Sequence, residues 1–272
     1  MKFLLCLSLS LMALFAEYKG CFVDENSQNI IFVKDGETKS LGLKEKIYKD
    51  QRCAFDESSF YVANLNNEIV KVASEKEFLF ALPNVGCKVS NILLEKEKIY
   101  VACDMANVVT IAIFDKSSKK FISKNFNNVY KISSFLPLGE GVFFTSFNGK
   151  AFLLDSKLNA KEQKSVGFAP VSACKFSDDE IFIGFRNGEI LDLKSGAKKQ
   201  VLRSKISALA CVGDEVLVAS EDGVIYKFDK SFKLKGKKEL FGGEIKEIFI
   251  DKNVLVGVDL GNKTKSLEIN SF

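Results

Sequence analysis

Histidine and tryptophan are absent from this sequence of 272 residues, and proline occurs only three times. The absence of histidine excludes a histidine general base, a histidine-assisted serine or cysteine nucleophile, and histidine metal ligands. The seven cysteines form no Cys-x-x-Cys pair, which argues against a thioredoxin-type redox site and a zinc ribbon. Neither a glycine-rich phosphate loop nor an aspartate-rich calcium loop is found. We therefore expect no metal, no cofactor and no catalytic residue.

A carboxylate-based enzyme, such as a glycoside hydrolase, is the catalytic alternative that remains, because it needs only aspartate and glutamate. These residues occur at turns and strand ends throughout the chain, where solvation accounts for them. A non-catalytic function is the better interpretation.

The first 16 residues have the pattern of a secretory signal peptide. Lys2 is followed by an uncharged run of 13 residues from Phe3 to Phe15, which is too short to span a bilayer. Leu14 departs from the small-residue rule three positions before a cleavage site after Ala16. A cytosolic protein with an apolar first strand is the alternative. The pattern favours an exported, periplasmic protein without stable membrane insertion.

Residues 17–272, which number 256, suit one large all-β domain. The chain is 47% hydrophobic and contains no linker-like stretch. The net charge of +4 is spread among interspersed lysines and acids, and short basic clusters such as 233–238 are typical of solvated strand edges. Nucleic-acid binding is therefore not expected, and we expect a monomer.

A strand–turn–strand pattern recurs along the chain. "VLVASEDGVIYKF" (216–228) aligns without a gap with "IFIGFRNGEILDL" (181–193) and "VFFTSFNGKAFLL" (142–154). Asp-Gly and Asn-Gly between apolar runs indicate tight hairpin turns, because these residues tolerate positive φ. The turns are spaced by 31 to 43 residues, and they fall at Gly36, Asn67, Ala106, Gly149, Gly188, Gly223 and Gly261.

Each unit also has an apolar strand upstream and a variable, often lysine-rich segment downstream that has room for a fourth strand. Repeats near forty residues without helical periodicity predict a single β-propeller of four-stranded antiparallel blades. Seven blades are expected, or six if the first unit serves only to close the ring. A strand near Tyr18 to Val23 is expected to complete the last blade.

The segment "ISALACVGDEVLVASEDGVIYKFD" (206–229) resembles the core of a WD40-type repeat. It has the apolar first strand, the Asp-containing turn, the Ala-Ser stretch, the Asp-Gly turn and a final Asp. The Gly-His and Trp-Asp landmarks of that family are missing, so the side-chain network that they form is not implied. The likeness covers nearly all of residues 17–272.

The signal-like start, the Lys/Asn/Phe-rich composition and the weak repeats together are similar to NapL, the family of propeller-like accessory proteins of periplasmic nitrate reductase systems. That resemblance implies a scaffold or maturation factor that binds another periplasmic protein, such as a respiratory reductase component. A propeller of the BamB type, which acts in outer-membrane protein assembly, is the alternative, although it is usually longer and carries a lipid-attachment motif. A carboxylate-based or sugar-binding propeller is the second alternative.

In a propeller the ends of the second strands converge on one face, around the central channel. The residues two positions before the turn glycine belong to that ring, and they are ordinary turn residues or members of a partner-binding face. Phe147 and Arg186 are the expected anchors of such a face. The six predicted residues are Leu65, Asp104, Phe147, Arg186, Glu221 and Asp259.

Six cysteines remain after residue 16. Cys21, Cys53, Cys174 and Cys211 take similar places on the first strands of their units, and equivalent strands of different blades are expected to lie beyond the 7 Å Cα limit for bridging. Buried thiols are thus favoured over a disulfide framework for these four. Cys87 and Cys103 lie within one repeat and are the pair expected to form a bridge, if any does.

Overall fold

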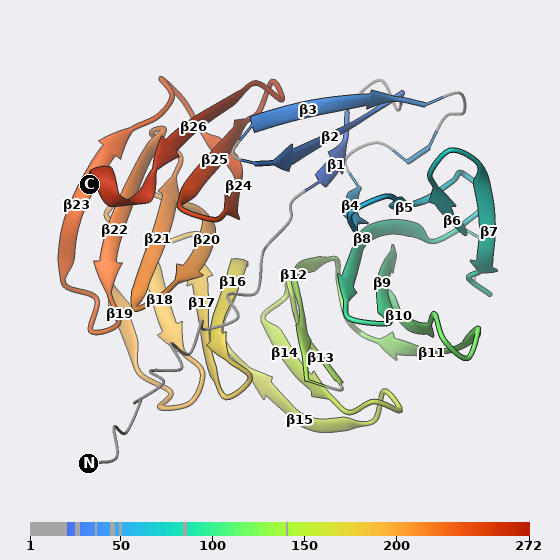
Figure 1. Cartoon of the computed structure of the whole chain (residues 1–272). Helices are drawn as coiled ribbons and strands as arrows, with labels where there is room; N and C mark the ends of the chain where they lie inside the picture. The colour runs from blue at the N-terminus through green and yellow to red at the C-terminus, as the bar shows by residue number, and fades with distance from the viewer. Residues whose placement is uncertain are drawn as a thin grey trace, which may run out of the picture.

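The chain folds almost entirely into antiparallel β-sheet in a computed structural model (Figure 1), which describes residues 21–24, 28–35, 37–43, 47–48, 51–83, 86–139 and 141–272. The predicted signal peptide, residues 1–16, and the turn residue Gly36 lie outside the described residues. One short 3-10 helix, η1 (Ile269–Ser271), follows the last strand. Within the described ranges, no helix is long and apolar enough to cross a membrane.

Five units contain four strands each, as the repeats predict. The first two are β4 (Arg52–Phe55), β5 (Phe60–Ala63), β6 (Glu68–Val72) and β7 (Lys76–Ala81), then β8 (Lys88–Glu95), β9 (Lys98–Met105), β10 (Val108–Asp115) and β11 (Lys120–Asn127). The third contains β12 (Ile132–Leu138), β13 (Gly141–Ser146), β14 (Lys150–Leu154) and β15 (Ala160–Ser165). The last two are β16 (Pro170–Ser177), β17 (Glu180–Phe185), β18 (Glu189–Asp192) and β19 (Lys198–Gln200), then β20 (Ile206–Val212), β21 (Glu215–Ser220), β22 (Val224–Asp229) and β23 (Leu234–Glu239).

Two units at the ends of the chain have three strands each in the described residues. They are β1 (Cys21–Val23), β2 (Asn29–Lys34) and β3 (Glu37–Gly42), and then β24 (Ile245–Asp251), β25 (Val254–Asp259) and β26 (Thr264–Glu268). The units follow one another around a central axis (Figure 1), with the first strand innermost and the fourth outermost. The fold is thus the predicted all-β propeller, and the number of blades stays a prediction.

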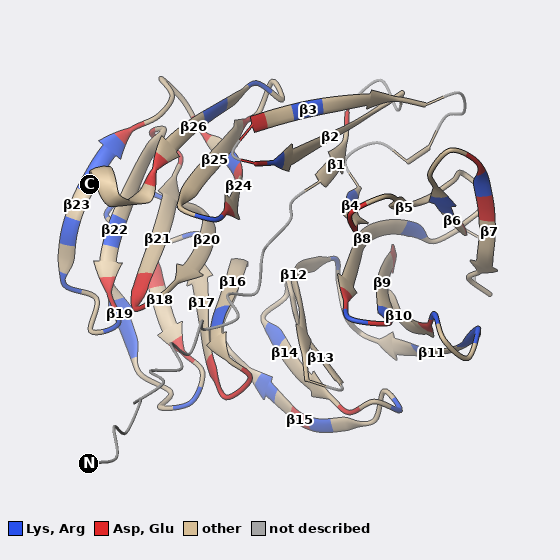
Figure 2. Ribbon diagram, in the orientation of Figure 1, with Lys and Arg blue, Asp and Glu red and all other residues tan. Residues whose placement is uncertain are grey.

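Burial follows this radial order. The second strands β13 and β21 are buried along almost their whole length, whereas the fourth strands β15, β19 and β23 are mostly exposed and rich in lysine (Figure 2). Neighbouring sheets pack face to face. For example, Tyr100 and Ile111 of one unit pack with Phe144 and Phe152 of the next. Because neighbouring sheets cover both faces of the inner strands, the sequences of these strands are nearly continuous apolar runs.

The ring closes through side chains. Phe22 of β1 stacks on Phe249 of β24, with ring centroids 6.3 Å apart, and Val33 and Val256 belong to the same apolar cluster. The expectation that a strand near Tyr18 to Val23 completes the last blade is wrong for the residues described: β1 pairs with β2 and β4, not with β26. The reason is that β1 continues directly into the hairpin β2–β3, so it is the innermost strand of its own unit.

The described residues contain three disulfide bonds, and two of them correct the expectation of free thiols at Cys21, Cys53, Cys174 and Cys211. Cys21 bonds to Cys53 across β1 and β4, with Cα atoms 5.2 Å apart. Cys174 bonds to Cys211 across β16 and β20, with Cα atoms 5.4 Å apart. The expected separation was wrong because the innermost strands of neighbouring units converge at the axis. The third bond joins Cys87 to Cys103 within one unit.

The predicted turns rest against the connection that leads from the fourth strand of a unit to the next innermost strand. Gly223 has φ +82°, and a Cβ atom there would lie 2.0 Å from the carbonyl oxygen of Phe241. The carbonyl of Gly223 accepts hydrogen bonds from the N–H groups of Leu240 and Phe241. Glycine is therefore required at this position both by φ and by the close approach of the backbone.

Substitution of this glycine tests the role of the turn. We expect Gly223→Ala to lower the free energy of unfolding by about 3 kcal/mol, because it combines left-handed strain with a backbone clash. Gly213→Ala is the matched control: it has φ +56° with no atom within 4 Å of the new Cβ, so only about 1 kcal/mol is expected. Urea denaturation followed by circular dichroism measures both losses. Equal losses would contradict the close approach of the Phe241 carbonyl to Gly223.

The bridge between β16 and β20 is the second test. Replacing both Cys174 and Cys211 with alanine should lower the free energy of unfolding by about 3 kcal/mol, because the bond closes a long loop in the unfolded chain. Peptide mapping without reduction should recover the two cysteines in one linked fragment. Recovery of two free thiols from the oxidised protein would show that the bond does not form.

Candidate functional site

The six residues predicted to form a binding face lie where the second strand of each unit meets the tight turn. Asp104 and Asp259 are still within β9 and β25, and the other four come after the strand has ended. Phe147, Arg186 and Glu221 donate their backbone N–H groups to the carbonyls of Lys131, Ala169 and Lys205 respectively. Those carbonyls belong to the connections that precede β12, β16 and β20. The turns after the second strands and these connections therefore form one face, which we call the loop face.

Phe147 and Arg186 are brought together through the connection before β16. The ring of Phe147 makes an edge-to-face contact with Phe168, with centroids 5.5 Å apart and an interplanar angle of 72°. Ala169 donates its N–H to the carbonyl of Phe147 and accepts the N–H of Arg186. Phe168 is 76% exposed. A large aromatic side chain thus lies in solvent, held between the two predicted anchors.

Tyr130 extends this surface. It is 50% exposed, and its carbonyl accepts a hydrogen bond from the N–H of Phe147. We call Tyr130, Phe147, Phe168 and Arg186 the aromatic patch. The sequence reasoning missed Tyr130 and Phe168 because it considered only the turns. The sequence signal that could have found them is an aromatic residue two positions before an innermost strand. Tyr130 precedes the strand that begins at Ile132, and Phe168 precedes the strand that begins at Pro170.

Glu221 lies beside the patch but already has a partner. Its carboxylate forms an ion pair with Lys205 and accepts the backbone N–H of that residue. The hydrogen bonds from Lys205 lower the pKa of Glu221, and the charge of Arg186 adds to this shift. Glu221 therefore carries a negative charge that Lys205 balances, which leaves the positive charge of Arg186 as the net charge at that edge of the patch.

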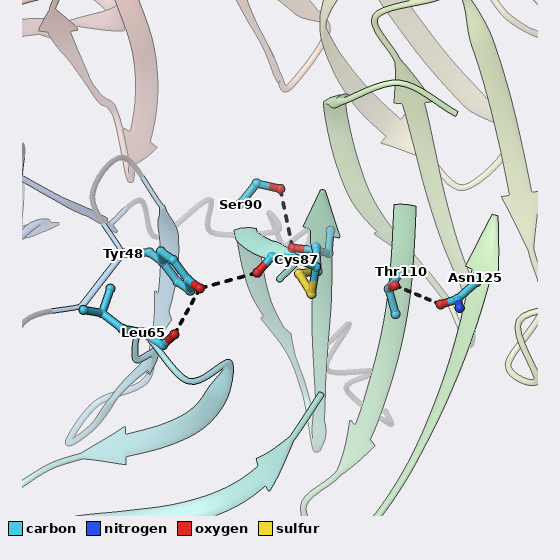
Figure 3. The surroundings of a disulfide bond; sticks show 8 residues. Tyr48, Leu65, Cys87, Ser90, Thr110 and Asn125 are labelled. Carbon is cyan, nitrogen blue, oxygen red and sulfur yellow. Dashed lines mark hydrogen bonds between the residues drawn. A yellow bond between two sulfur atoms is a disulfide. The ribbon is translucent and has the colours of Figure 1, made fainter. Parts of the chain in front are cut away.

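The remaining three predicted residues lie elsewhere and have structural partners. Asp104 accepts the N–H of Ile132 at 2.9 Å, which links two units, and burial raises its pKa. The carbonyl of Leu65 accepts a hydrogen bond from the Tyr48 hydroxyl, which also donates to the carbonyl of Cys87 beside a disulfide (Figure 3). Asp259 caps its own turn through the N–H of Lys263 at 2.8 Å. The structure does not gather these three into the aromatic patch.

The central cavity is lined by the innermost strands and contains none of the six predicted residues. Five innermost strands have a register shift near their start, as between Ile132 and Ser134 of β12 and between Ile245 and Glu247 of β24. The residue after the shift faces the cavity in four units, where Ser134, Ser172, Ala208 and Glu247 line it. Bulges of this kind redirect side chains, and nothing in the periodicity of the sequence reveals them.

The cavity is small, about 70 Å³, and its polar groups are mostly paired. Glu247 is buried and forms an ion pair with Arg52, which also lines the cavity. Burial raises the pKa of Glu247, and the positive charge of Arg52 opposes that shift. A glycoside hydrolase requires two carboxyl groups about 5 to 9.5 Å apart, whereas Glu247 is the one carboxylate among the described residues that line this cavity.

The Arg52–Glu247 pair generates a pH-dependent prediction. Arg52→Ala leaves a buried carboxylate without its cation, so its folded-state pKa rises further above the ordinary value of 4.5. A carboxyl group whose pKa is higher in the folded state than in the unfolded state destabilises the fold increasingly as the pH rises above the ordinary value of 4.5. We expect a loss of about 2 kcal/mol in the free energy of unfolding at pH 7 and a smaller loss at pH 4. The same substitution in a Glu247→Gln background should lose this pH dependence, and a loss that is equal at both pH values would contradict the ion pair.

Comparison with known proteins identifies the fold and no closer relationship. No family model matches the chain, and no curated protein matches its sequence. Among solved structures, the WD40 β-propeller domain of Doa1 has a TM-score of 0.69 at 10% identity, covering 92% of this chain and 89% of that one. The computationally designed Ika8 protein has a TM-score of 0.63 at 13% identity (89% and 81% covered), and BamB from Moraxella catarrhalis has 0.58 at 12% identity (93% and 91% covered). The chain thus has the fold of WD40-like β-propellers.

Proposed function

We propose that this chain is a non-catalytic, exported propeller that binds another protein through the aromatic patch of its loop face. The observation that carries the proposal is the Phe147–Phe168 pair beside Arg186, with Phe168 exposed to solvent. Burial of aromatic and arginine side chains accounts for most of the binding energy in many protein interfaces. Such residues are enriched in interface centres relative to the rest of the protein surface.

The distribution of exposed apolar side chains supports the loop face as the binding surface. Eight large hydrophobic residues of the described chain are exposed, and they fall into two groups. One group lies on the fourth strands and contains Phe78, Phe121, Ile122 and Leu234. The other lies in the turns and connections of the loop face and contains Leu65, Tyr130, Phe168 and Leu260. The second group gathers in segments whose backbone is already fixed, so little ordering is needed on binding.

The disulfides and the sequence of the first 16 residues support the proposed compartment. Three cross-links are typical of proteins that mature in an oxidising environment such as the periplasm. Residues 1–16 supply the export signal in this proposal. The partner is a component of a respiratory reductase, as the resemblance to propeller-like accessory proteins of periplasmic nitrate reduction implies. Outer-membrane assembly machinery, the BamB-type alternative, is the other partner that the fold allows.

Alanine at Phe168 and Arg186 tests the proposal. Each substitution should weaken capture of the partner at least tenfold in a pulldown from periplasmic extract, since interface anchors contribute about 2 kcal/mol or more. Neither should change the melting temperature, because both side chains are exposed. The captured protein is identified by mass spectrometry, and reductase components are the expected result.

Phe78→Ala is the matched control, because Phe78 is 58% exposed on the outer strand β7, away from the loop face. It should leave capture unchanged. Equal capture by Phe168→Ala and wild type would refute the assignment of the patch. Recovery of an outer-membrane assembly protein would replace the reductase as partner.

A further inference from the structure

β26 occupies the third position of its sheet, and the described residues place no fourth strand beside it, whereas five other units have one. It pairs with β25 from Thr264 to Glu268 without a register shift, and no second partner strand is found for it among the described residues. In the neighbouring unit, β23 pairs with the outer edge of β22 over the equivalent stretch. In the described part of the chain, the edge of β26 is therefore open where the repeat places a strand.

The hydrogen-bonding pattern defines which backbone groups face that open edge. Asp259 donates its N–H to the carbonyl of Lys263, and Ile269 donates to Asn253, so these residues form bonded pairs at the two ends of the β25–β26 ladder. Bonded and non-bonded pairs alternate in an antiparallel ladder. Residues 265 and 267 consequently bond to β25, and the N–H groups of Thr264, Ser266 and Glu268 point outward.

The chain that follows β26 takes another course. The carbonyl of Ile269 accepts a hydrogen bond from Lys227 of β22, and the hydroxyl of Ser271 accepts one from Lys238 of β23. The ring of Phe272 lies under the Lys227 and Lys238 ammonium groups, at 5.7 and 5.9 Å. Residues 269–272 thus pack on the preceding unit and do not cover the edge of β26.

A cleft of about 700 Å³ adjoins the open edge and carries excess positive charge. It is lined on one side by Thr264, Lys263 and Lys265 and on the other by Thr38, Lys39 and Ser40 of β3. Three lysines face one carboxylate there, Asp259, which caps its own turn. Figure 2 shows the basic segments on β3 and β26 in neighbouring sheets. An acidic segment matches this charge.

We propose that the edge of β26 accepts an extended acidic segment of a partner protein, which adds as the fourth antiparallel strand of the last unit. Main-chain hydrogen bonds to Thr264, Ser266 and Glu268 supply the affinity, and Lys39, Lys263 and Lys265 select for acidic side chains, as in other cases of β-strand addition. This surface is separate from the aromatic patch and independent of the function proposed for it. β3 has an open edge too, but the residues beside it, 36 and 44–46, lie outside the described chain.

Ser266→Pro tests the pairing directly. It removes an outward N–H at an exposed strand edge, where proline is tolerated, so the fold is retained. The probe is a fluorescein-labelled seven-residue peptide that alternates glutamate and valine, measured by anisotropy. We expect Ser266→Pro to bind it at least tenfold more weakly than wild type, and Ser266→Ala, the matched control, to bind within twofold. The amides of Thr264 and Ser266 should exchange rapidly in the free protein and become protected when the peptide is bound.

The charge and the specificity are tested alongside. Lys39→Glu/Lys263→Glu should weaken binding at least tenfold, the same peptide with a central proline should not bind, and Phe168→Ala should bind as wild type does. Absence of peptide binding by the wild type, or equal binding by Ser266→Pro, overturns the proposal. Two other occupants of the edge would also overturn the proposal. A dimer in sedimentation that the peptide dissociates would indicate a second copy of this chain. Tighter peptide binding by a chain that begins at Cys21 than by residues 17–272 would indicate competition from the chain's own residues before Cys21.

Discussion

The crossing of the outer connection over the tight turn is the constraint on which the rest of the structure depends. In three units the turn glycine, at 149, 188 or 223, has positive φ. A carbonyl oxygen of the connection lies so close to it that a Cβ atom would clash. The glycine carbonyl in turn accepts N–H groups from the same connection. Asn67 repeats the arrangement, with φ +60° and a hydrogen bond from the N–H of Leu82. This contact fixes where the chain leaves one sheet, and thereby where the next innermost strand begins.

The loop face follows from that constraint. Phe168 comes directly after Gly167, whose carbonyl rests on the turn at Gly149, so its backbone is held while its side chain is free to reach solvent. Repeats share the backbone geometry that the fold needs, and the side chains at these positions differ from unit to unit. In the proposed function, the connections therefore contribute to recognition as much as the turns do. Of the residues expected from the turns alone, Phe147 and Arg186 join the patch, whereas Asp104 and Asp259 serve the backbone.

The parts of the fold that the sequence predicts are those set by local chemistry. Asp222-Gly223 and the alternating apolar residues around it specify a hairpin, and its recurrence specifies stacked blades. Proximity between units is not local, which is why the bridges Cys21–Cys53 and Cys174–Cys211 were not expected. The bulge after Ile132 leaves no mark on the periodicity, so the turn of Ser134 toward the cavity was invisible as well. Tyr130 and Phe168 were visible as aromatic residues, but their importance depends on the crossing described above.

Closure by side chains has a consequence for the edges of the ring. A strand shared between the first and last units would cover the edge of β26 and hold the ring by main-chain hydrogen bonds. Here the junction is held instead by the stacking of Phe22 on Phe249 and by the ion pair of Asp35 with Lys252. Phe22 and Phe249 lie on innermost strands, whereas Asp35 directly follows β2 and Lys252 directly follows β24. Neither contact uses the backbone of a third strand. Among the described residues, these contacts join the two units without a strand in the outer position beside β26. An exposed strand edge can pair with other chains and cause aggregation, unless it is protected or is occupied by a specific partner. The basic cleft beside β26 favours the second of these, in which a strand of a partner protein pairs with the edge.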